Sequence, residues 1–149
     1  MDISARADYG LRALAELAAA GGGPMTVTEL AEAQDIPARF LQNILLQLRR
    51  RGVLHSQRGT DGGYRLARPP EEITLAEVIR ALEGPLAGIR GVRPESVVYE
   101  GAAEHVIDVW LAVRVSLRSV LEHVTLDDLA RKSLPDPIVA LARSPRAAP

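Results

Sequence analysis

Three polar residues near the start of a predicted helix have side chains that can hydrogen-bond to the edges of DNA bases. Apolar residues recur at helical spacing between residues 37 and 51, which leaves Arg39, Gln42 and Asn43 on the opposite face. An arginine fork matches guanine O6 and N7, and a Gln or Asn amide matches adenine N6 and N7. Gln47 is expected to face outward further along the same helix. The predicted core face consists of Phe40, Leu41, Ile44, Leu45 and Leu48.

The same region carries an unusual concentration of positive charge. The whole chain has a net charge of −1, but residues 36–68 contain seven arginines and one acid, Asp61, an excess of six positive charges. A basic segment in a near-neutral chain is typical of a surface that binds a phosphate backbone. A solvated basic face would have the same composition, and the arginines at 49–51 equally suit the negative end of a helix dipole.

Two short helices joined by a tight turn would position these side chains. Residues 26–29 (Thr-Val-Thr-Glu) have the pattern of a capping box, which predicts a helix to about residue 34. Asp35-Ile36-Pro37 predicts a break, and Gly52 follows the next helix where helices commonly end. A first helix is predicted over residues 3–20. This order is typical of a helix-turn-helix, whose second helix enters the major groove by its N-terminal end.

A glycine-rich hairpin is predicted directly after the second of these helices. Residues 53–57 and 64–67 favour short strands, and the loop between them contains Gly59, Gly62 and Gly63, which permit a tight turn. Arg58 and Arg65 flank the loop, where they could contact phosphates or a narrow minor groove. The alternative is a plain surface hairpin. With a further helix from about residue 74 to 84, residues 1–83 are predicted to form a winged helix-turn-helix.

The second half of the chain is predicted to contain a long apolar helix. Residues 84–100 form a connection without periodic pattern. Residues 101–123 favour a helix too long for so small a core, with an apolar face that runs from Ala103 to Val124 and could pack against a partner. A short helix follows, so residues 101–134 form one unit. The proline-rich tail 135–149 is expected to fray from residue 144. The predicted fold class is mainly α with a small β-hairpin, a winged helix-turn-helix plus a long C-terminal dimerisation helix.

Composition and motifs argue against several other classes of protein. The sequence has no cysteine, which excludes thiolate metal sites and disulfides, and it shows no catalytic triad, P-loop or dinucleotide fingerprint. We therefore expect no enzyme. His105 and His123 lie about 27 Å apart along one helix and cannot share a metal within a chain. No apolar run is long enough for a membrane span and residues 1–4 do not start a signal peptide, so a cytoplasmic protein is expected.

Three stretches of the sequence resemble a known family. Residues 5–14 (ARADYGLRAL), 36–42 (IPARFLQ) and 58–66 (RGTDGGYRL) are similar to the IscR/NsrR/CymR-like (Rrf-type) bacterial winged-helix regulators, and the resemblance extends over about residues 1–133. It implies a dimeric transcription regulator, usually a repressor, that binds a pseudo-palindromic operator. It also implies that the helix at 101–123 crosses its symmetry mate. The dimer contacts then fall on Val106, Trp110, Val113, Leu117, Val120 and Leu121.

The sequence departs from that family in its connection. Many members carry three cysteines there that hold an iron–sulfur cluster, whereas residues 85–100 contain none. Asp8 falls where some relatives supply an oxygen ligand, but one carboxylate does not replace the missing thiolates. We expect a member without a cofactor. An effector, if one exists, is expected near Asp8, Tyr9, Arg12 and the connection, and Trp110 could either pack in the interface or line that effector site.

The predicted partners are double-stranded DNA, a second copy of the chain and an effector or partner protein of unknown identity. The alternative is a protein-interaction module of the same fold that docks a partner protein. The predicted DNA contacts are Thr26, Ala38, Arg39, Gln42, Asn43, Gln47, Arg58, Gly59, Gly62, Gly63, Tyr64 and Arg65.

Overall fold

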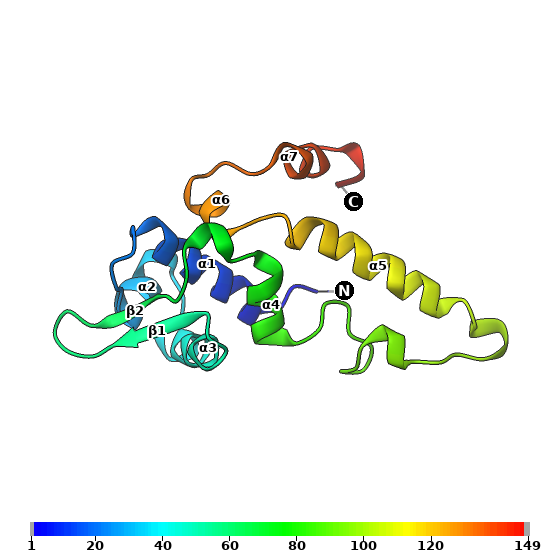
Figure 1. Cartoon of the computed structure of the whole chain (residues 1–149), viewed down its shortest axis with the longest axis horizontal. Helices are drawn as coiled ribbons and strands as arrows, with labels where there is room; N and C mark the ends of the chain where they lie inside the picture. Colours follow the sequence, from blue (N-terminus) through cyan, green and yellow to red (C-terminus); the bar gives the residue numbers. More distant parts are fainter. Residues whose placement is uncertain (1, 148–149) are drawn as a thin grey trace.

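The computed structural model describes residues 2–147. Residues 5–83 form a head, and one long helix extends away from it (Figure 1). The predicted fold class is confirmed, since the described chain is mainly helical with one two-stranded antiparallel hairpin. The helices are α1 Ala5–Ala19, α2 Val27–Gln34, α3 Ala38–Arg50, α4 Leu75–Glu83, α5 Val106–Leu121, α6 Leu126–Ala130 and α7 Asp136–Ala142. The strands are β1 Leu54–Gln57 and β2 Gly63–Leu66, and short 3₁₀ turns span Pro70–Glu72, Pro94–Ser96, Gly101–Ala103 and Pro145–Ala147.

The core of the head forms where α1 to α4 meet. The capping box of α2 is present as predicted, with Thr26 accepting from the backbone of Glu29 and the Glu29 carboxylate accepting from the backbone of Thr26. Aliphatic side chains fill the interior because the chain has few aromatic residues. The largest fully buried ones include Leu14, Leu17, Leu30, Leu41, Leu45, Leu48 and Leu54.

The segment after α5 returns to the head. The backbone of Leu75 donates to Val124 and that of Leu126 donates to Ile73, and Val124 and Leu126 are almost completely buried. The expectation that Val124 continues the outer face of the long helix is therefore wrong, because its side chain packs in the head. The expected division is modified as well: α6 packs on α1 and belongs with residues 1–83.

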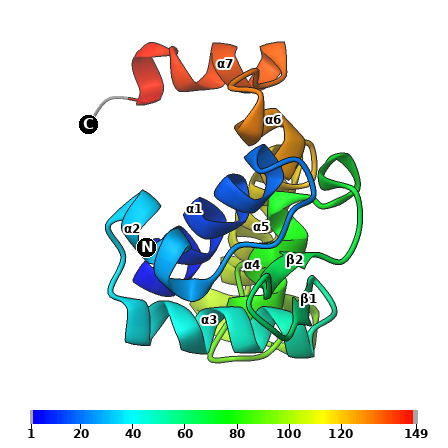
Figure 2. The same ribbon diagram turned by 90° about the vertical axis from the view of Figure 1, so that its left-hand side faces the viewer.

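Two predicted boundaries in the second half also differ from the structure. The long helix covers Val106–Leu121 rather than 101–123, because residues 101–103 form a 3₁₀ turn before it. Residues 136–142 of the expected proline-rich tail form α7, which lies on the opposite side of the head from α3 (Figure 2). Proline at the first positions of a helix has no amide hydrogen to leave unpaired, so Pro135 and Pro137 start α7 without cost.

Candidate nucleic-acid interface

A left-handed turn sets the direction of α3. Asp35 ends α2 with φ 51° and ψ 52°, and the following Ile36 is buried and donates its amide to Ala31. Pro37 then precedes α3 and accepts from the amide of Leu41. The turn packs the apolar face of α3 into the head, where Leu41, Ile44, Leu45 and Leu48 are buried.

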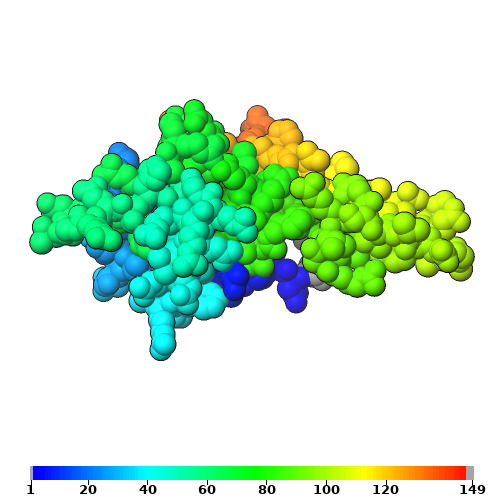
Figure 3. All heavy atoms as spheres, turned by 60° about the horizontal axis from the view of Figure 1, so that its bottom comes forward, coloured from blue at the N-terminus to red at the C-terminus, as the bar shows by residue number. Residues whose placement is uncertain are grey.

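The N-terminal end of α3 is exposed as the spacing predicted. Ala38, Arg39, Gln42 and Asn43 are all exposed, and α3 lies along one face of the head (Figure 3). This end of the helix presents guanidinium and amide groups to solvent next to a small residue. Such a surface can approach a groove closely and exchange hydrogen bonds with base edges.

Phe40 does not lie in the core, contrary to expectation. Its side chain is 41% exposed and meets the ring of Tyr9 edge-on, with ring centroids 5.6 Å apart. Phe40 borders the apolar face of α3 and contacts α1 through Tyr9.

Gln47 faces α4 instead of the exposed surface. Its amide nitrogen donates to the carbonyls of Ala81 and Leu82, each at 3.0 Å, and its oxygen accepts from Arg6 at 3.4 Å. The last carbonyls of a helix have no partner within that helix. Gln47 satisfies two of them at the end of α4, so the expectation that it faces outward beside the DNA-contacting residues is wrong.

The glycines of the hairpin hold it against the start of α2. Met25 and Tyr64 exchange two backbone hydrogen bonds, of 2.7 and 2.9 Å. A Cβ atom on Gly63 would lie 2.4 Å from the carbonyl oxygen of Met25, and one on Gly62 would lie 2.4 Å from that of Gln57. Gly62 and Gly63 therefore permit close backbone contacts. Sequence reasoning missed Met25 because it takes part through its backbone alone.

The remaining hairpin residues differ in how exposed their side chains are and in whether they already form hydrogen bonds. Arg58 and Gly59 are exposed at the loop, whereas Tyr64 is half-buried and packs against the core. Arg65 donates to Gln57 at 2.6 Å, and its Nε is buried without a hydrogen-bond partner among the described residues. Arg58 is thus the most accessible charge of the predicted wing contacts. Thr26 is exposed, but its hydroxyl and amide both serve the α2 cap.

The residues predicted for an effector contact one another and α2. Arg12 lies over the ring of Tyr9, with its guanidinium carbon 5.3 Å from the centroid, and pairs with Asp8 at 3.1 Å. Arg12 also donates to the side chain and backbone carbonyl of Gln34. These contacts join α1 to the end of α2, which gives the three residues a structural role.

A second surface is the outer face of α5. Eleven of its sixteen residues are apolar, yet none is buried. Val109 and Val115 are 57% and 65% exposed. An apolar groove runs along the helix, lined by Val109, Ala112, Val113, Ser116, Leu117, Val120 and Leu121.

Four of the six predicted dimer residues line this groove. Trp110 does not, because it faces the connection beside Tyr99 and Ile89, and Val106 lies outside it as well.

These surfaces define a class of protein. A helix-turn-helix whose second helix exposes a polar N-terminal end, followed by a glycine-tipped hairpin, is a winged-helix DNA-binding domain. The chain belongs to the Rrf2 family, whose profile, described as an iron-dependent transcriptional regulator, matches residues 3–132. It is a DNA-binding transcription regulator rather than an enzyme.

Similar proteins and solved structures support this family assignment. The chain is 45% identical over 148 residues to a Mycobacterium tuberculosis protein classed as an HTH-type transcriptional regulator, covering 99% of this chain and 92% of that relative. The solved structure of CymR from B. subtilis matches with a TM-score of 0.74 at 33% identity, covering 89% of this chain and 98% of that chain. The structure of T. potens IscR matches with a TM-score of 0.72 at 32% identity, covering 89% and 88%.

The side chains present do not fit the iron that the family description mentions. The sequence supplies no thiolate, and residues 2–147 contain no group of three or more His, Asp or Glu side chains placed to hold a metal ion. Over the same residues, no helix is long and apolar enough to cross a membrane.

Proposed function

We propose that the protein represses transcription as a homodimer bound to a pseudo-palindromic operator, without an iron–sulfur cluster. It would act in the cytoplasm, where bacterial DNA lies. The main observation in support of a dimer is the exposed apolar face of α5. A helix about 24 Å long gains little stability from its own backbone in water and normally buries its apolar side. A second copy of α5, related by a two-fold axis, would cover the groove from Val109 to Leu121.

Each subunit of such a dimer would present one copy of the reading surface. Arg39, Gln42 and Asn43 are proposed to contact base edges, with Ala38 permitting close approach, and Arg58 is proposed to contact the backbone from the wing. Gly62, Gly63 and Tyr64 are proposed to contribute by holding the wing in place. The comparisons support a regulator that binds DNA and give no support to a module that only docks proteins.

Selection of bound fragments from a random DNA pool tests the proposal. We expect an inverted repeat whose half-sites are separated by about one helical turn, 10–10.5 base pairs between centres, or a multiple of it. The logarithm of the affinity should fall linearly with the logarithm of the salt concentration, since phosphate contacts release counterions. Enrichment of single half-sites, or of no preferred sequence, would contradict the homodimeric repressor.

Two glutamines of α3 provide a matched comparison, because Gln42 is exposed and Gln47 faces α4. Replacing Gln42 by Ala should change the base preference at one operator position by about 1–3 kcal/mol, because a bidentate contact is lost. The free energy of unfolding should change by less than about 0.5 kcal/mol, since Gln42 is exposed. Selection experiments and urea unfolding measure the two effects.

Replacing Gln47 by Ala should give the opposite result. Two carbonyls at the end of α4 would lose their donor, which should lower the free energy of unfolding by about 1–3 kcal/mol. The base preference should not change. A variant of Gln47 that alters base preference while keeping its stability would show that this side chain contacts DNA after all.

A further inference from the structure

Four arginines line a pocket where the head meets α5. Arg51 follows the last residue of α3, Arg80 lies on α4, Arg93 lies in the connection and Arg114 lies on α5. Gly84, Pro85 and Leu86 complete the lining, and the pocket has a volume of about 320 Å³. Guanidinium groups from four separate segments thus surround one space.

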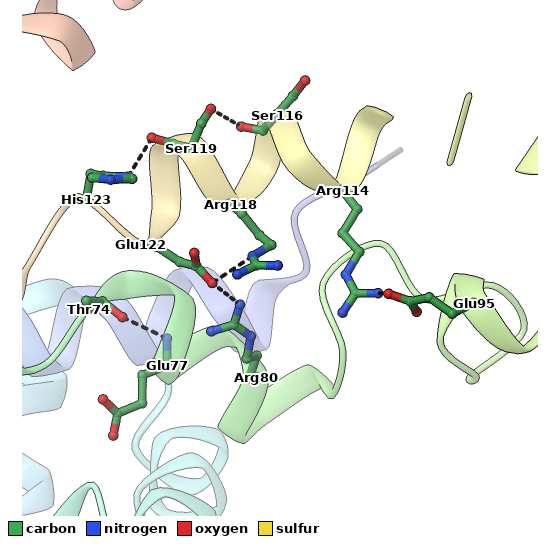
Figure 4. Close-up of polar contacts among 10 residues, drawn as sticks. All are labelled: Thr74, Glu77, Arg80, Glu95, Arg114, Ser116, Arg118, Ser119, Glu122 and His123. Atoms are coloured by element: carbon green, nitrogen blue, oxygen red, sulfur yellow. Dashed lines mark hydrogen bonds and ion pairs between the residues drawn. The ribbon is translucent and has the colours of Figure 1, made fainter. Parts of the chain in front are cut away.

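Two of these arginines have carboxylate partners. Arg80 pairs with Glu122, which also accepts from Arg118 at 3.0 Å, and Arg114 pairs with Glu95 (Figure 4). The hydrogen bond from Arg80, followed by that from Arg118, holds the pKa of Glu122 below its ordinary value. A backbone hydrogen bond and then Arg114 lower the pKa of Glu95 in the same way. Both acids therefore carry a full charge at neutral pH.

Arg51 and Arg93 make no such close ion pair, although the charge of Arg93 also contributes, after that of Arg114, to lowering the pKa of Glu95. Among residues 2–147, no ion pair joins either of them to a carboxylate, and both are exposed. The region around the pocket therefore keeps an excess of positive charge even after the negative charges of Glu95 and Glu122 are counted. Like charges gathered in a pocket repel one another, and an anion placed between them relieves that repulsion.

We propose that this pocket binds an oxyanion of the phosphate or sulfate type. Arginine forks match the planar edge of two oxyanion oxygens, and donors converging from several directions suit a tetrahedral group. Arg51 lies about 18 Å along the α3 axis from Arg39, so the pocket is separate from the base-reading end. Its walls come from α4 and α5, and a bound anion would join the head to the helix proposed for dimerisation. That coupling rests on the proposed function, whereas anion binding does not.

Titration of the full chain without DNA tests anion binding. Inorganic phosphate, pyrophosphate and sulfate are added while chloride keeps the ionic strength constant, and binding is followed by calorimetry and by the fluorescence of Trp110. This tryptophan is the only one in the sequence and lies one turn before Arg114 on α5. We expect saturable binding. The double variant Arg51→Gln/Arg93→Gln should bind about tenfold to a hundredfold more weakly, because two charge-assisted hydrogen bonds are lost.

The control variant Arg143→Gln/Arg146→Gln removes the same charge elsewhere. Both residues are exposed at the end of the chain, outside the pocket, and should leave anion affinity unchanged. The variant Arg51→Lys/Arg93→Lys should bind with intermediate affinity, since it keeps the charge but loses the planar fork. It also repeats the comparison if the glutamine variant unfolds.

DNA binding then distinguishes a free anion from a phosphate of the DNA. Free-anion binding that changes DNA affinity assigns the pocket to a small-molecule effector. No free-anion binding, together with a salt slope reduced by about two in the double variant, assigns it to DNA phosphates. The proposal is overturned if the pocket variant and the control variant give the same anion titration and the same dependence of DNA affinity on salt. Failure to select a preferred operator, with anion binding intact, would instead contradict the proposed function alone.

Discussion

Replacing Val113 by Glu should convert the protein from a dimer to a monomer at micromolar concentration. Val113 lines the apolar groove of α5, so in the proposed dimer the new carboxylate would lie between two helices. Burying a charge without a partner costs several kcal/mol, and the two-fold axis brings in two such charges. Sedimentation equilibrium measures the effect directly. Folding of the subunit should be kept, because no residue of α5 is buried in it.

The same change should weaken operator binding strongly. A dimer binds its second half-site as an intramolecular event, which raises affinity by about a hundredfold to ten-thousandfold over a single half-site. Titration of a labelled operator should show a loss of that size. Binding to a single half-site should be unaffected, since α3 is unchanged.

Val115 gives the matched control for this experiment. It is a valine on the same helix and 65% exposed, but it lies outside the groove, beside Arg118 and His123. Replacing Val115 by Glu should leave both the dimer and the operator affinity unchanged. If Val113→Glu stays dimeric, or if both variants dissociate equally, the groove is not the interface.

Most of the fold could be predicted because local patterns specify it. The capping box at Thr26 and the break at Asp35 fix α2 and the turn, and the apolar period fixes α3. The exposed positions of Arg39 and Gln42 follow from that period. These features depend on neighbours within a few residues, which the sequence displays directly.

The errors arose where distant segments decide the outcome. Gln47 lies at the border of the exposed face of α3, and only the position of α4 shows that its amide serves two carbonyls there. Val124 continues the apolar period of the long helix, but pairing with Leu75 draws it into the head. The arginine pocket joins residues from 51 to 114, and no local pattern could indicate it. The start of α7, by contrast, could have been predicted from Pro135 and Pro137, because prolines are common at the first positions of a helix.

Replacing Gly63 by Ala should detach the wing from α2 and lower the stability of the protein. Gly63 has φ 141°, which side chains with a Cβ rarely adopt, and its Cβ would lie 2.4 Å from the carbonyl oxygen of Met25. The obstacle is backbone, so the two hydrogen bonds between Met25 and Tyr64 must break. Backbone strain and the lost hydrogen bonds together should lower the free energy of unfolding by about 2–5 kcal/mol. Urea unfolding measures this change.

A substitution at Gly59 distinguishes the cost of backbone strain from the cost of losing the hydrogen bonds between Met25 and Tyr64. Gly59 too has a positive φ, of 104°, but no atom lies within 4 Å of a Cβ placed there. Replacing Gly59 by Ala should therefore cost only the strain, about 1–3 kcal/mol, and keep the wing against α2. DNA affinity, measured where each variant is folded, should fall by about tenfold or more for Gly63→Ala, because Arg58 loses its position and the charge-assisted contact proposed for it. Equal losses of stability and affinity in the two variants would mean that Gly63 serves the turn alone. A larger loss for Gly63 would show that the wing contacts DNA only while Met25 holds it in place.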